Sequence, residues 1–260
     1  MNNNSQNLQV SIITVCFNSA ETIRDSIESV LSQNYPNIEY IIIDGGSTDG
    51  TLDIINKYQD KITVNISEPD DGIYDAMNKG MHNATGDVIG FINSDDFYPS
   101  KTVLSSIAQV FSDESIDACY GDLCYVKQNN TQSVVRYWKS SAFEPGSFRD
   151  GWSPPHPTLF VRRNIYEKYG MFDLDYKIAA DVELMMRLLE VHDVNAAYLP
   201  EVLVHMRLGG ETNKSIGNII RQNQEIWRAL KMHGLKPSLF RFIGGKVLSR
   251  GKQFVVRPSE

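Results

Sequence analysis

The chain has few cysteines and no long apolar segment. Its 260 residues include three cysteines, too few and too odd in number for a disulfide framework, and the C-x4-C pair of Cys119 and Cys124 has no second pair with which to hold zinc. No apolar run approaches the about 18 residues that span a membrane, and the N-terminus lacks a basic start followed by an apolar run. We therefore expect a cytoplasmic protein whose membrane contact, if any, is peripheral at the inner face of the membrane.

Positive charge and the common nucleotide-binding motifs are also scarce. The formal net charge is −7, which argues against a nucleic-acid partner, because such proteins carry a basic surplus. No G-x-G-x-x-G follows the first apolar run and no G-x-x-x-x-G-K-[ST] occurs in the sequence. These absences argue against a dinucleotide-dependent dehydrogenase and a P-loop NTPase.

The first hundred residues alternate apolar runs with amphipathic segments. Residues 10–17 form a β-branched run typical of a strand buried on both faces. Further strands are predicted at 38–44, 62–67 and 87–93, with helices at 20–33, 51–59 and 72–84 between them. This alternation predicts an α/β fold with a mostly parallel, Rossmann-like sheet and helices on both faces. A strand order of 3-2-1-4 would place the carboxyl ends of the first and fourth strands beside the ligand crevice.

The second half is less regular and ends in a basic segment. Strands are predicted at 116–126 and 133–138, a loop at 144–157, and helices at 164–169, 181–192 and 215–234. From Arg228 onward there are eight basic residues and one acidic residue. The apolar and basic segment 235–257 is typical of a surface that lies on an anionic membrane; a helix packed on the domain with solvated lysines is the alternative. Pro237, Gly244 and Gly245 are expected to break any single long helix there.

Acidic side chains follow three successive strands of the predicted sheet. Asp44 ends the second strand, Asp71 and Lys79 follow the third, and Asp95 and Asp96 follow the fourth. Each has a plain structural alternative as a turn, a helix cap or a solvated charge. Their convergence on the carboxyl edge of one sheet favours a ligand site.

The pair in FINSDDF has a chemical rationale at such an edge. Carboxylates bind Mg²⁺ or Mn²⁺, whose other positions are filled by substrate phosphates and water. Since neighbouring side chains in an extended chain point to opposite faces, we expect Asp96 to face the metal and Asp95 to address a ribose or orient the site. A metal on a departing diphosphate neutralises the charge that develops there, which suits a nucleotide-activated donor.

The motifs together carry a resemblance to a known family. The chain resembles an inverting family 2 glycosyltransferase with the GT-A fold, in the branch that builds bacterial exopolysaccharides, lipopolysaccharide O-antigens and colanic acid. The match covers roughly residues 9–210. The matching stretches are SIITVCFN, EYIIIDGGSTDGT, SEPDDGIYDAMNKGMHNATGDVIGFINSDDF, PPHPTLFVRRNIYEKYGMFD and YKIAADVELMMRL.

The resemblance implies an activity and a domain plan. It implies a metal-dependent hexosyltransferase that moves a sugar from a nucleotide-diphosphate sugar, UDP-linked, to a hydroxyl of a glycan acceptor on a polyprenyl diphosphate. It also implies a GT-A domain at 1–212, with a nucleotide-binding half at about 8–100 and an acceptor-binding half at about 101–212. A basic helical extension would follow at 213–260.

Residue roles on the donor side follow by position. The resemblance implies that Val15 and Phe17 line the nucleotide pocket and that Asp44 contacts the base. Asp71 and Lys79 would flank the nucleotide and its diphosphate. NSDD stands where the family has its D-x-D metal motif, but Asn93 replaces the first acid. Asparagine keeps an acceptor and loses a charge, which puts metal binding at that position in doubt.

Asp181 stands where the resemblance implies a catalytic base. The family often has Glu-Asp there, whereas this chain has AAD, so one carboxylate remains. One base is what inversion needs, since it takes the proton of the attacking hydroxyl. The alternative is that Asp181 caps its helix.

Four further residues are candidates around the donor and acceptor. Trp152 can stack on a sugar or pack in the core, and His156 lies in a loop expected to meet the acceptor, although a lone histidine is often structural. His205 and Arg207 belong to HMRLGGET, which resembles the loop that closes over the donor.

Two other readings stay open. A nucleotidyltransferase of nucleotide-sugar synthesis uses a similar sheet and metal, but would normally carry a glycine-rich, basic loop after the first strand. An inactive module that only binds sugar nucleotides is the non-enzymatic alternative.

Overall fold

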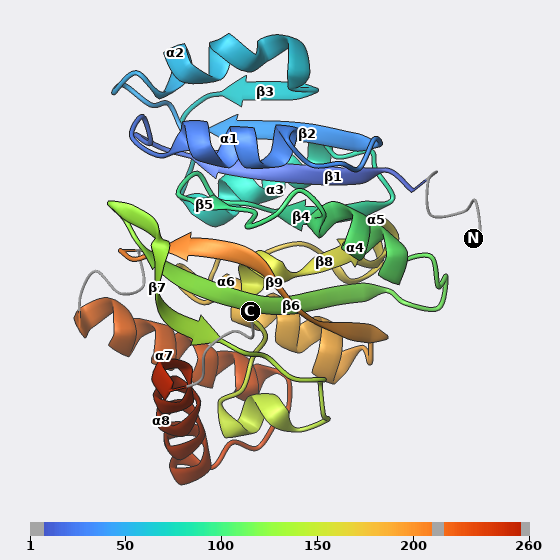
Figure 1. Cartoon of the computed structure of the whole chain (residues 1–260). Helices are drawn as coiled ribbons and strands as arrows, with labels where there is room; N and C mark the ends of the chain where they lie inside the picture. The colour runs from blue at the N-terminus through green and yellow to red at the C-terminus, as the bar shows by residue number, and fades with distance from the viewer. Residues whose placement is uncertain (1–7, 210–215, 256–260) are drawn as a thin grey trace.

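The computed structural model describes residues 8–209 and 216–255 (Figure 1). Within them a nine-stranded sheet carries helices on both faces. The strands are β1 (Val10–Cys16), β2 (Ile38–Asp44), β3 (Val64–Ser67), β4 (Val88–Phe91), β5 (Asp96–Phe97), β6 (Ala118–Lys127), β7 (Asn130–Trp138), β8 (Phe160–Arg162) and β9 (Ala196–Arg207). The α-helices are α1 (Ile23–Leu31), α2 (Thr51–Ile55), α3 (Ile73–Asn83), α4 (Val103–Val110), α5 (Arg163–Tyr169), α6 (Ala180–Met186), α7 (Ile216–Met232) and α8 (Leu239–Val255). Short helical turns are η2 (Asn56–Lys61), η3 (Ser147–Asp150), η4 (His156–Thr158) and η5 (Arg187–Val191).

The sheet confirms the predicted order of the first four strands. Its order is β3-β2-β1-β4-β8-β6-β9-β5, with β7 paired to β6. The first four strands pair in parallel, whereas β8 runs antiparallel to both β4 and β6, so the second half of the sheet is mixed. The carboxyl ends of β1 and β4 therefore flank the point where strand order reverses, as the sequence predicts.

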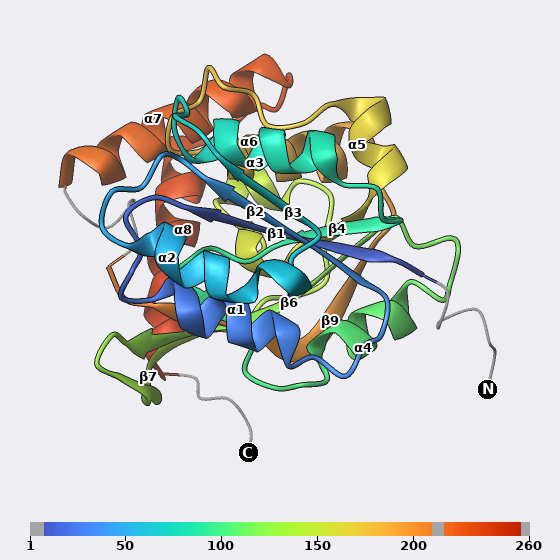
Figure 2. The same ribbon diagram turned by 90° about the horizontal axis from the view of Figure 1, so that it is seen from above.

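Two hydrophobic layers cover the sheet. Ile13 and Val15 of β1 belong to the hydrophobic cluster shared with α3, α5 and α6, while Ile12 and Cys16 belong to the cluster shared with α1, α2 and α4. These two groups of helices lie on opposite sides of the sheet (Figure 2). This alternation follows from the two-residue period of a strand. Burial on both faces explains why β1 reads as an unbroken apolar run.

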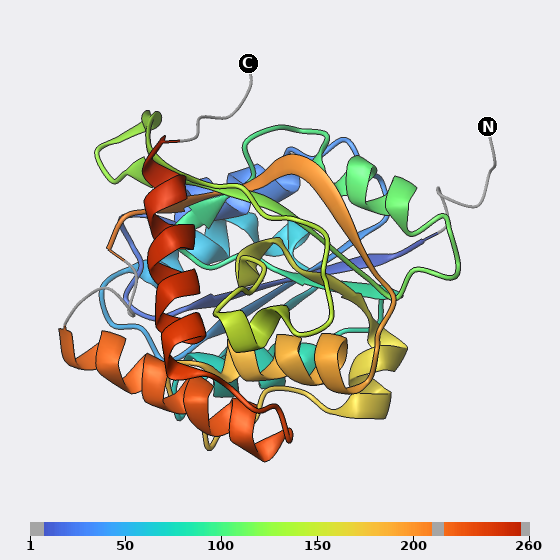
Figure 3. The same cartoon turned by 90° about the horizontal axis from the view of Figure 1, so that it is seen from below.

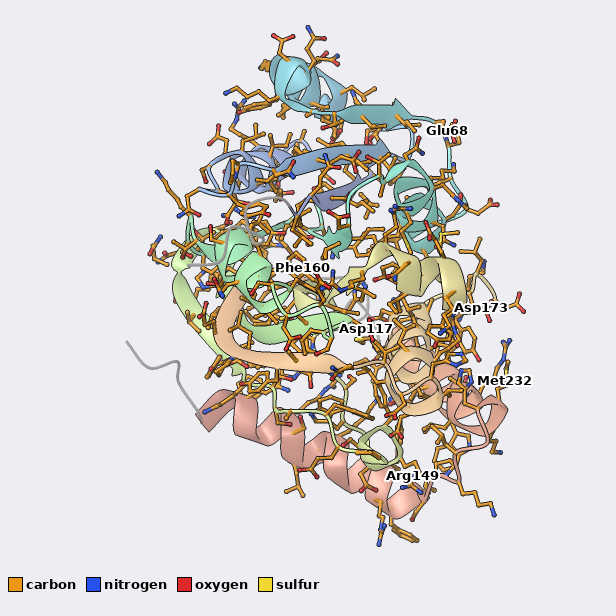
Figure 4. All side chains as sticks on the ribbon, turned by 90° about the vertical axis from the view of Figure 1, so that its right-hand side faces the viewer. Glu68, Asp117, Arg149, Phe160, Asp173 and Met232 are labelled. Carbon is orange, nitrogen blue, oxygen red and sulfur yellow. The ribbon has the colours of Figure 1, made fainter. Side chains whose placement is uncertain are left out.

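The two halves of the sheet meet where β8 lies against β4. Phe160 of β8 is fully buried inside the molecule (Figure 4). It is paired with Gly90 of β4, and a Cβ at position 90 would lie 2.3 Å from the Phe160 ring. Glycine at 90 is thus what lets an aromatic ring join the two halves.

The C-terminal helices share the core of the domain. On α7, the side chains of Ile226, Ala229 and Leu230 are buried in the cluster that includes α6. Helix α8 runs along the underside of the molecule against β7 and η3 (Figure 3). The boundary predicted at residue 212 falls outside the described residues. Within the described parts of the chain, none of the helices has both the length and the apolar character to span a bilayer.

The expectation that glycines break the last helix is wrong. Helix α8 runs through Gly244 and Gly245, and Pro237 precedes its first turn. A Cβ built at Gly245 would lie 1.8 Å from the carbonyl oxygen of Asp150 in η3, and one at Gly244 would have no atom within 4 Å. Gly245 therefore permits a close backbone contact that docks α8 on η3.

This contact gives a stability prediction with a matched control. Gly245→Ala is expected to lower the free energy of unfolding by about 1–3 kcal/mol, because the methyl group must displace α8 from η3. Gly244→Ala, one position away, is expected to raise it by about 1 kcal/mol through helix propensity alone. Urea denaturation of the two variants measures both effects. Equal stabilisation by the two substitutions would contradict the packing of α8 described above.

Candidate active site

An open pocket of about 860 Å³ lies at the carboxyl ends of β1 and β4. Its first wall comes from the loops after β1, β3 and β4, with Phe17, Asp70 and Asp95 among the lining residues. Its second wall comes from the segment 151–157, the start of α6, and helices α7 and α8. The pocket is therefore built by both halves of the chain.

The loop after β1 supplies an exposed aromatic face. Phe17 is 63 % exposed and lines the pocket, and Val15 lines it from the strand end. An exposed aromatic ring at the edge of a pocket can stack on a flat ligand, because both surfaces are apolar. The placement of both residues fits the role expected for them.

Asp44 holds a loop and does not line the pocket. Its carboxylate is fully buried and accepts hydrogen bonds from the N–H groups of Gly46 (3.1 Å) and Ser47 (3.0 Å) and from the hydroxyl of Ser67 (2.7 Å). Burial alone would raise the pKa of Asp44, but hydrogen bonds from Ser47 and Ser67 lower it. Asp44 therefore fixes the DGGSTDG loop. Its buried position does not favour the expected contact with a nucleotide base.

In the loop after β3, Asp70 faces the pocket and Asp71 does not. The side chain of Asp70 lines the pocket and accepts a hydrogen bond from the N–H of Gly72 at 2.9 Å. Lys79 lies outside the pocket, where its ammonium pairs with Glu68 at 2.9 Å and Asp75 at 3.5 Å. Asp71 and Lys79, which were expected to flank the nucleotide, therefore do not line the pocket. Asp70, which was not among the predicted site residues, lines it instead.

The Asp95–Asp96 pair has the opposite orientation to the one expected. Asp95 lines the pocket, whereas Asp96 begins β5, is fully buried and lies 3.3 Å from the amide nitrogen of Asn93. Burial, and then the nearby Asp95 carboxylate, raise the pKa of Asp96. The guanidinium of Arg207 donates to the carbonyl oxygen of Asp95 at 2.8 Å and so holds this turn in place.

Asn93 and Asp95 present oxygen atoms that fit a hard divalent cation. Asn93 lines the pocket, and its buried Oδ1, like the buried Oδ1 of Asp96, has no hydrogen-bond partner among the described residues. Across residues 8–209 and 216–255, this pocket included, no three His, Cys, Asp or Glu side chains are grouped to hold a metal ion by themselves. A cation here would take its remaining ligands from substrate phosphates and water, as Mg²⁺ commonly does.

Asp181 lines the pocket and does not cap its helix. Helix α6 begins at Ala180 with Ala179 at the N-cap, and no side chain caps it. The hydroxyl of Tyr74 lies 3.0 Å from Oδ1 of Asp181 and donates to it. Burial and the Asp181 charge raise the pKa of Tyr74, so Tyr74 keeps its proton as a donor. Asp181 is therefore not the N-cap of α6, and its carboxylate is held by the hydroxyl of Tyr74.

Trp152 and His156 form part of the wall beside Asp181. The His156 ring packs on Phe91 and Phe172, with centroids at 5.6 and 5.5 Å, and its buried Nε2 has no hydrogen-bond partner. Burial lowers the pKa of His156, so the ring is neutral near pH 7. Trp152 lines the pocket while packing edge-on against Phe148. Both residues combine packing with access to a ligand.

His205 and Arg207 lie behind the pocket wall. The His205 ring packs on Phe97 at 5.4 Å, and Arg207 is 5 % exposed and paired with Asp25. In the same segment, Met206 and Gly209 line the pocket. The rest of the loop expected to close over the donor, residues 210–212, lies outside the described residues.

A cationic group on the second wall was not among the predicted site residues, although Lys246 and Arg250 belong to the basic segment that follows Arg228 in the sequence. Arg136 of β7 and Lys177, Lys246 and Arg250 all line the pocket. Lys246 and Arg250 are four residues apart on α8, a spacing that places them on one helix face and could have marked them. Arg136 lies in β7, and no spacing to another basic residue in that strand marks it as part of a cationic group.

Comparisons with known proteins identify the family of the chain. A model of glycosyl transferase family 2 matches residues 11–179. An uncharacterized glycosyltransferase of Mycobacterium tuberculosis is 32 % identical over 180 residues, 68 % of each chain. A glycosyltransferase of PGL/p-HBAD biosynthesis from Mycobacterium bovis is 29 % identical over 208 residues, 78 % of each chain.

Solved structures share the fold at low identity. The Staphylococcus aureus TarS 1–349 structure has a TM-score of 0.68 at 19 % identity, over 97 % of this chain and 76 % of that one. The mannosyltransferase PcManGT of Pyrobaculum calidifontis, in complex with GDP-Man and Mn²⁺, has a TM-score of 0.63 at 17 % identity, over 93 % and 70 %. The expected GT-A-type α/β fold is confirmed, and the surface-polysaccharide branch stays a prediction. The chain belongs to glycosyl transferase family 2 and is a glycosyltransferase.

Proposed function

We propose that the protein transfers a sugar from a UDP-linked donor to a hydroxyl of a glycan acceptor with inversion, in the synthesis of a bacterial surface polysaccharide. The observation that carries this proposal is that Asp95 and Asp181, from opposite walls, line one pocket. A carboxylate on the donor side and a carboxylate base on the acceptor side are what a single displacement at an anomeric carbon requires.

The proposed reaction breaks one bond and forms another. Asp181 takes the proton of the acceptor hydroxyl while that oxygen bonds to the anomeric carbon. The bond from this carbon to the diphosphate oxygen breaks, and its electron pair leaves on the nucleotide diphosphate. Because attack and departure occur on opposite faces, the configuration inverts. Tyr74, 3.0 Å from Oδ1 of Asp181, orients the carboxylate for this proton transfer.

Asn93 and Asp95 are the residues proposed to hold Mn²⁺ or Mg²⁺. Such an ion supplies charge neutralisation for a departing diphosphate. Asp95 contributes a charge and Asn93 a neutral oxygen, so this chain offers less negative charge to a cation than two acids would. We therefore propose that donor and metal bind together, each completing the site of the other.

The nucleoside side of the donor is assigned to the first wall. Phe17 offers an exposed ring, and Asp70 offers a carboxylate at the same edge. Asp44 does not contact the donor in this proposal; its hydrogen bonds hold the loop that follows β2 in place. UDP as the donor nucleotide is supported by the structure of TarS in complex with UDP, a neighbour in fold with a TM-score of 0.64 at 19 % identity, over 89 % of this chain and 67 % of that one.

A nucleotide panel tests the donor proposal. UDP with Mn²⁺ is expected to raise the melting temperature, because a ligand that binds only the folded state stabilises it. UDP without metal, and GDP, CMP or dTDP with Mn²⁺, are expected to give smaller shifts. If another nucleotide gives the largest shift, the UDP assignment fails, and if none shifts the melt, the donor-binding role fails with it. Hydrolysis of a UDP-sugar by the protein in the presence of Mn²⁺ would distinguish an enzyme from an inactive module that only binds sugar nucleotides.

The acceptor is proposed to be linked to a polyprenyl diphosphate, and segment 235–257 to rest on the membrane that carries it. The support is an exposed apolar face on α8, where Phe240 is 90 % exposed, Val247 64 % and Leu248 67 %. Basic residues of the same segment would face anionic lipid headgroups.

A further inference from the structure

Three cationic side chains gather on the pocket wall formed by β7 and α8. Arg136 of β7 and Lys246 and Arg250 of α8 line this wall. Among the ion pairs of the described residues, none involves any of the three. Lys246 instead donates to the neutral Asn223 Oδ1 at 2.8 Å. The wall therefore carries uncompensated positive charge.

The charge of Arg250 acts on both of the other cations. Burial, and then the charge of Arg250, lower the pKa of Lys246 to about 8. Burial also lowers the pKa of Arg136, and Arg250 adds to the effect. Like charges held together in a partly buried site are unfavourable until an anion joins them. Their gathering is therefore typical of an anion site and not of a packing surface.

Buried polar atoms without partners mark the same wall. Nε of Arg136 is buried and has no hydrogen-bond partner, although its guanidinium stacks 3.8 Å above the Tyr125 ring. Gln253 lines the pocket, is 6 % exposed, and leaves Oε1 without a partner. Rotation of the amide would present its N–H groups to an anion instead. Since buried unpaired polar groups are rare, these atoms fit a ligand.

The wall lies on the acceptor side of the pocket. Lys246 and Asp181 line the same pocket, and the negative charge of Asp181 partly opposes the lowering of the Lys246 pKa. Phe17 and Asp95, on the proposed donor side, come from loops of the first half, whereas β7 and α8 belong to the second half (Figure 1). An anion on this wall would therefore approach with the acceptor.

We propose that Arg136, Lys246 and Arg250 form a subsite for a phosphate group carried by the acceptor. This inference rests on the proposed function and names the acceptor chemistry of the same site. Guanidinium groups bind phosphate oxygens through paired N–H donors, and the ammonium of Lys246 adds a third charge. Arg250 lies at the rim, where its side chain is exposed.

An apolar stripe beside the subsite bears on where the phosphate comes from. Ile243, Val247 and Phe254 are 52 %, 64 % and 57 % exposed. Their spacing places them on the helix face next to Arg250. A phosphate attached to a lipid chain would use both the cations and the stripe, whereas a soluble phosphate ester would use the cations alone.

Binding of inorganic diphosphate to the full chain tests the subsite. Calorimetry is done with saturating UDP and Mn²⁺, so that the donor's own diphosphate position is filled. Arg250→Gln and Lys246→Gln are each expected to weaken binding about tenfold, the effect of losing a charge-assisted hydrogen bond. Arg241→Gln is the matched control, because Arg241 is exposed on the same helix and does not line this pocket. Melting temperatures verify that the variants are folded.

Two results would overturn the assignment. One is diphosphate affinity in Arg250→Gln equal to that in Arg241→Gln. The other is an equal loss of UDP affinity in Arg250→Gln, since the cations would then hold the donor. Failure of the proposed function is seen separately, as wild-type protein that no nucleotide stabilises.

A vesicle assay distinguishes the sources of the phosphate. Phosphatidylcholine vesicles containing a polyprenyl diphosphate are sedimented with wild type and with Val247→Ser. Weaker retention of Val247→Ser, with unchanged affinity for inorganic diphosphate, supports the subsite with a lipid-carried phosphate. Equal retention of the two proteins, with loss of diphosphate affinity in Arg250→Gln, supports it with a soluble phosphate ester.

Discussion

Asp181→Asn is expected to lower the rate of sugar transfer about a thousandfold, the range typical of losing a general base. The amide cannot take the proton of the acceptor hydroxyl, although it fills the same space in the pocket. Its Oδ1 can still accept the hydrogen bond that Tyr74 gives to Asp181 at 3.0 Å. The variant is therefore expected to fold and to keep the rise in melting temperature that a bound nucleotide causes. Initial rates with donor and acceptor, beside nucleotide-induced melting shifts, measure the two effects.

The matched control for this variant is Asp175→Asn. Asp175 lies in the loop before α6, and its side chain is 79 % exposed. Removing its charge alters the same region without touching the pocket, and transfer should stay within about twofold, as for surface substitutions generally. Comparable activity of Asp181→Asn and Asp175→Asn would exclude Asp181 as the base.

Asp95→Asn is expected to abolish the metal-dependent part of nucleotide binding and to slow transfer about a hundredfold or more. The substitution removes the carboxylate that lines the pocket beside Asn93, and two neutral amides hold a hard cation poorly. Loss of charge neutralisation at the diphosphate accounts for the rate effect. Melting shifts with UDP across a Mn²⁺ titration, together with initial rates, check the prediction.

Asp96→Asn is the control that separates the two neighbouring acids. Asp96 is fully buried and does not line the pocket. We expect this variant to have a different free energy of unfolding. The rise in melting temperature caused by UDP is expected to keep its dependence on Mn²⁺. The reverse pattern, with metal dependence lost in Asp96→Asn and kept in Asp95→Asn, would assign the metal to Asp96.

The alternation of apolar runs and amphipathic segments in the first hundred residues was sufficient to predict the parallel part of the sheet. β1 reads as an apolar run because both of its faces are buried, and the helices beside it show one apolar stripe each. These are local signals, repeated along the chain. The mixed second half was less predictable, because the antiparallel pairing of β8 with β4 depends on residues far apart in sequence, such as Phe160 and Gly90.

The candidate site was predictable to the level of the loop, and not to the level of the residue. The sequence marked Asp71 and the pair of Asp95 and Asp96, yet the structure turns Asp70 and Asp95 to the pocket, and Asp96 is buried. Adjacent side chains diverge, and the backbone of the loop decides which one points inward. Asp44 shows the same limit, since its donor Ser47 comes from the loop after β2 and its donor Ser67 from the end of β3.

By itself the sequence determined the α/β class, the family, and the edge of the sheet where the ligand site lies, because these follow from periodicity and from ordered motifs. Only the tertiary structure decided that α8 closes the pocket with Lys246 and Arg250 and that Gly245 lets it approach η3. The physical reason is that a helix face acquires its role from what it packs against. Arg136 and Arg250, from β7 and α8, become one cationic wall through long-range packing alone.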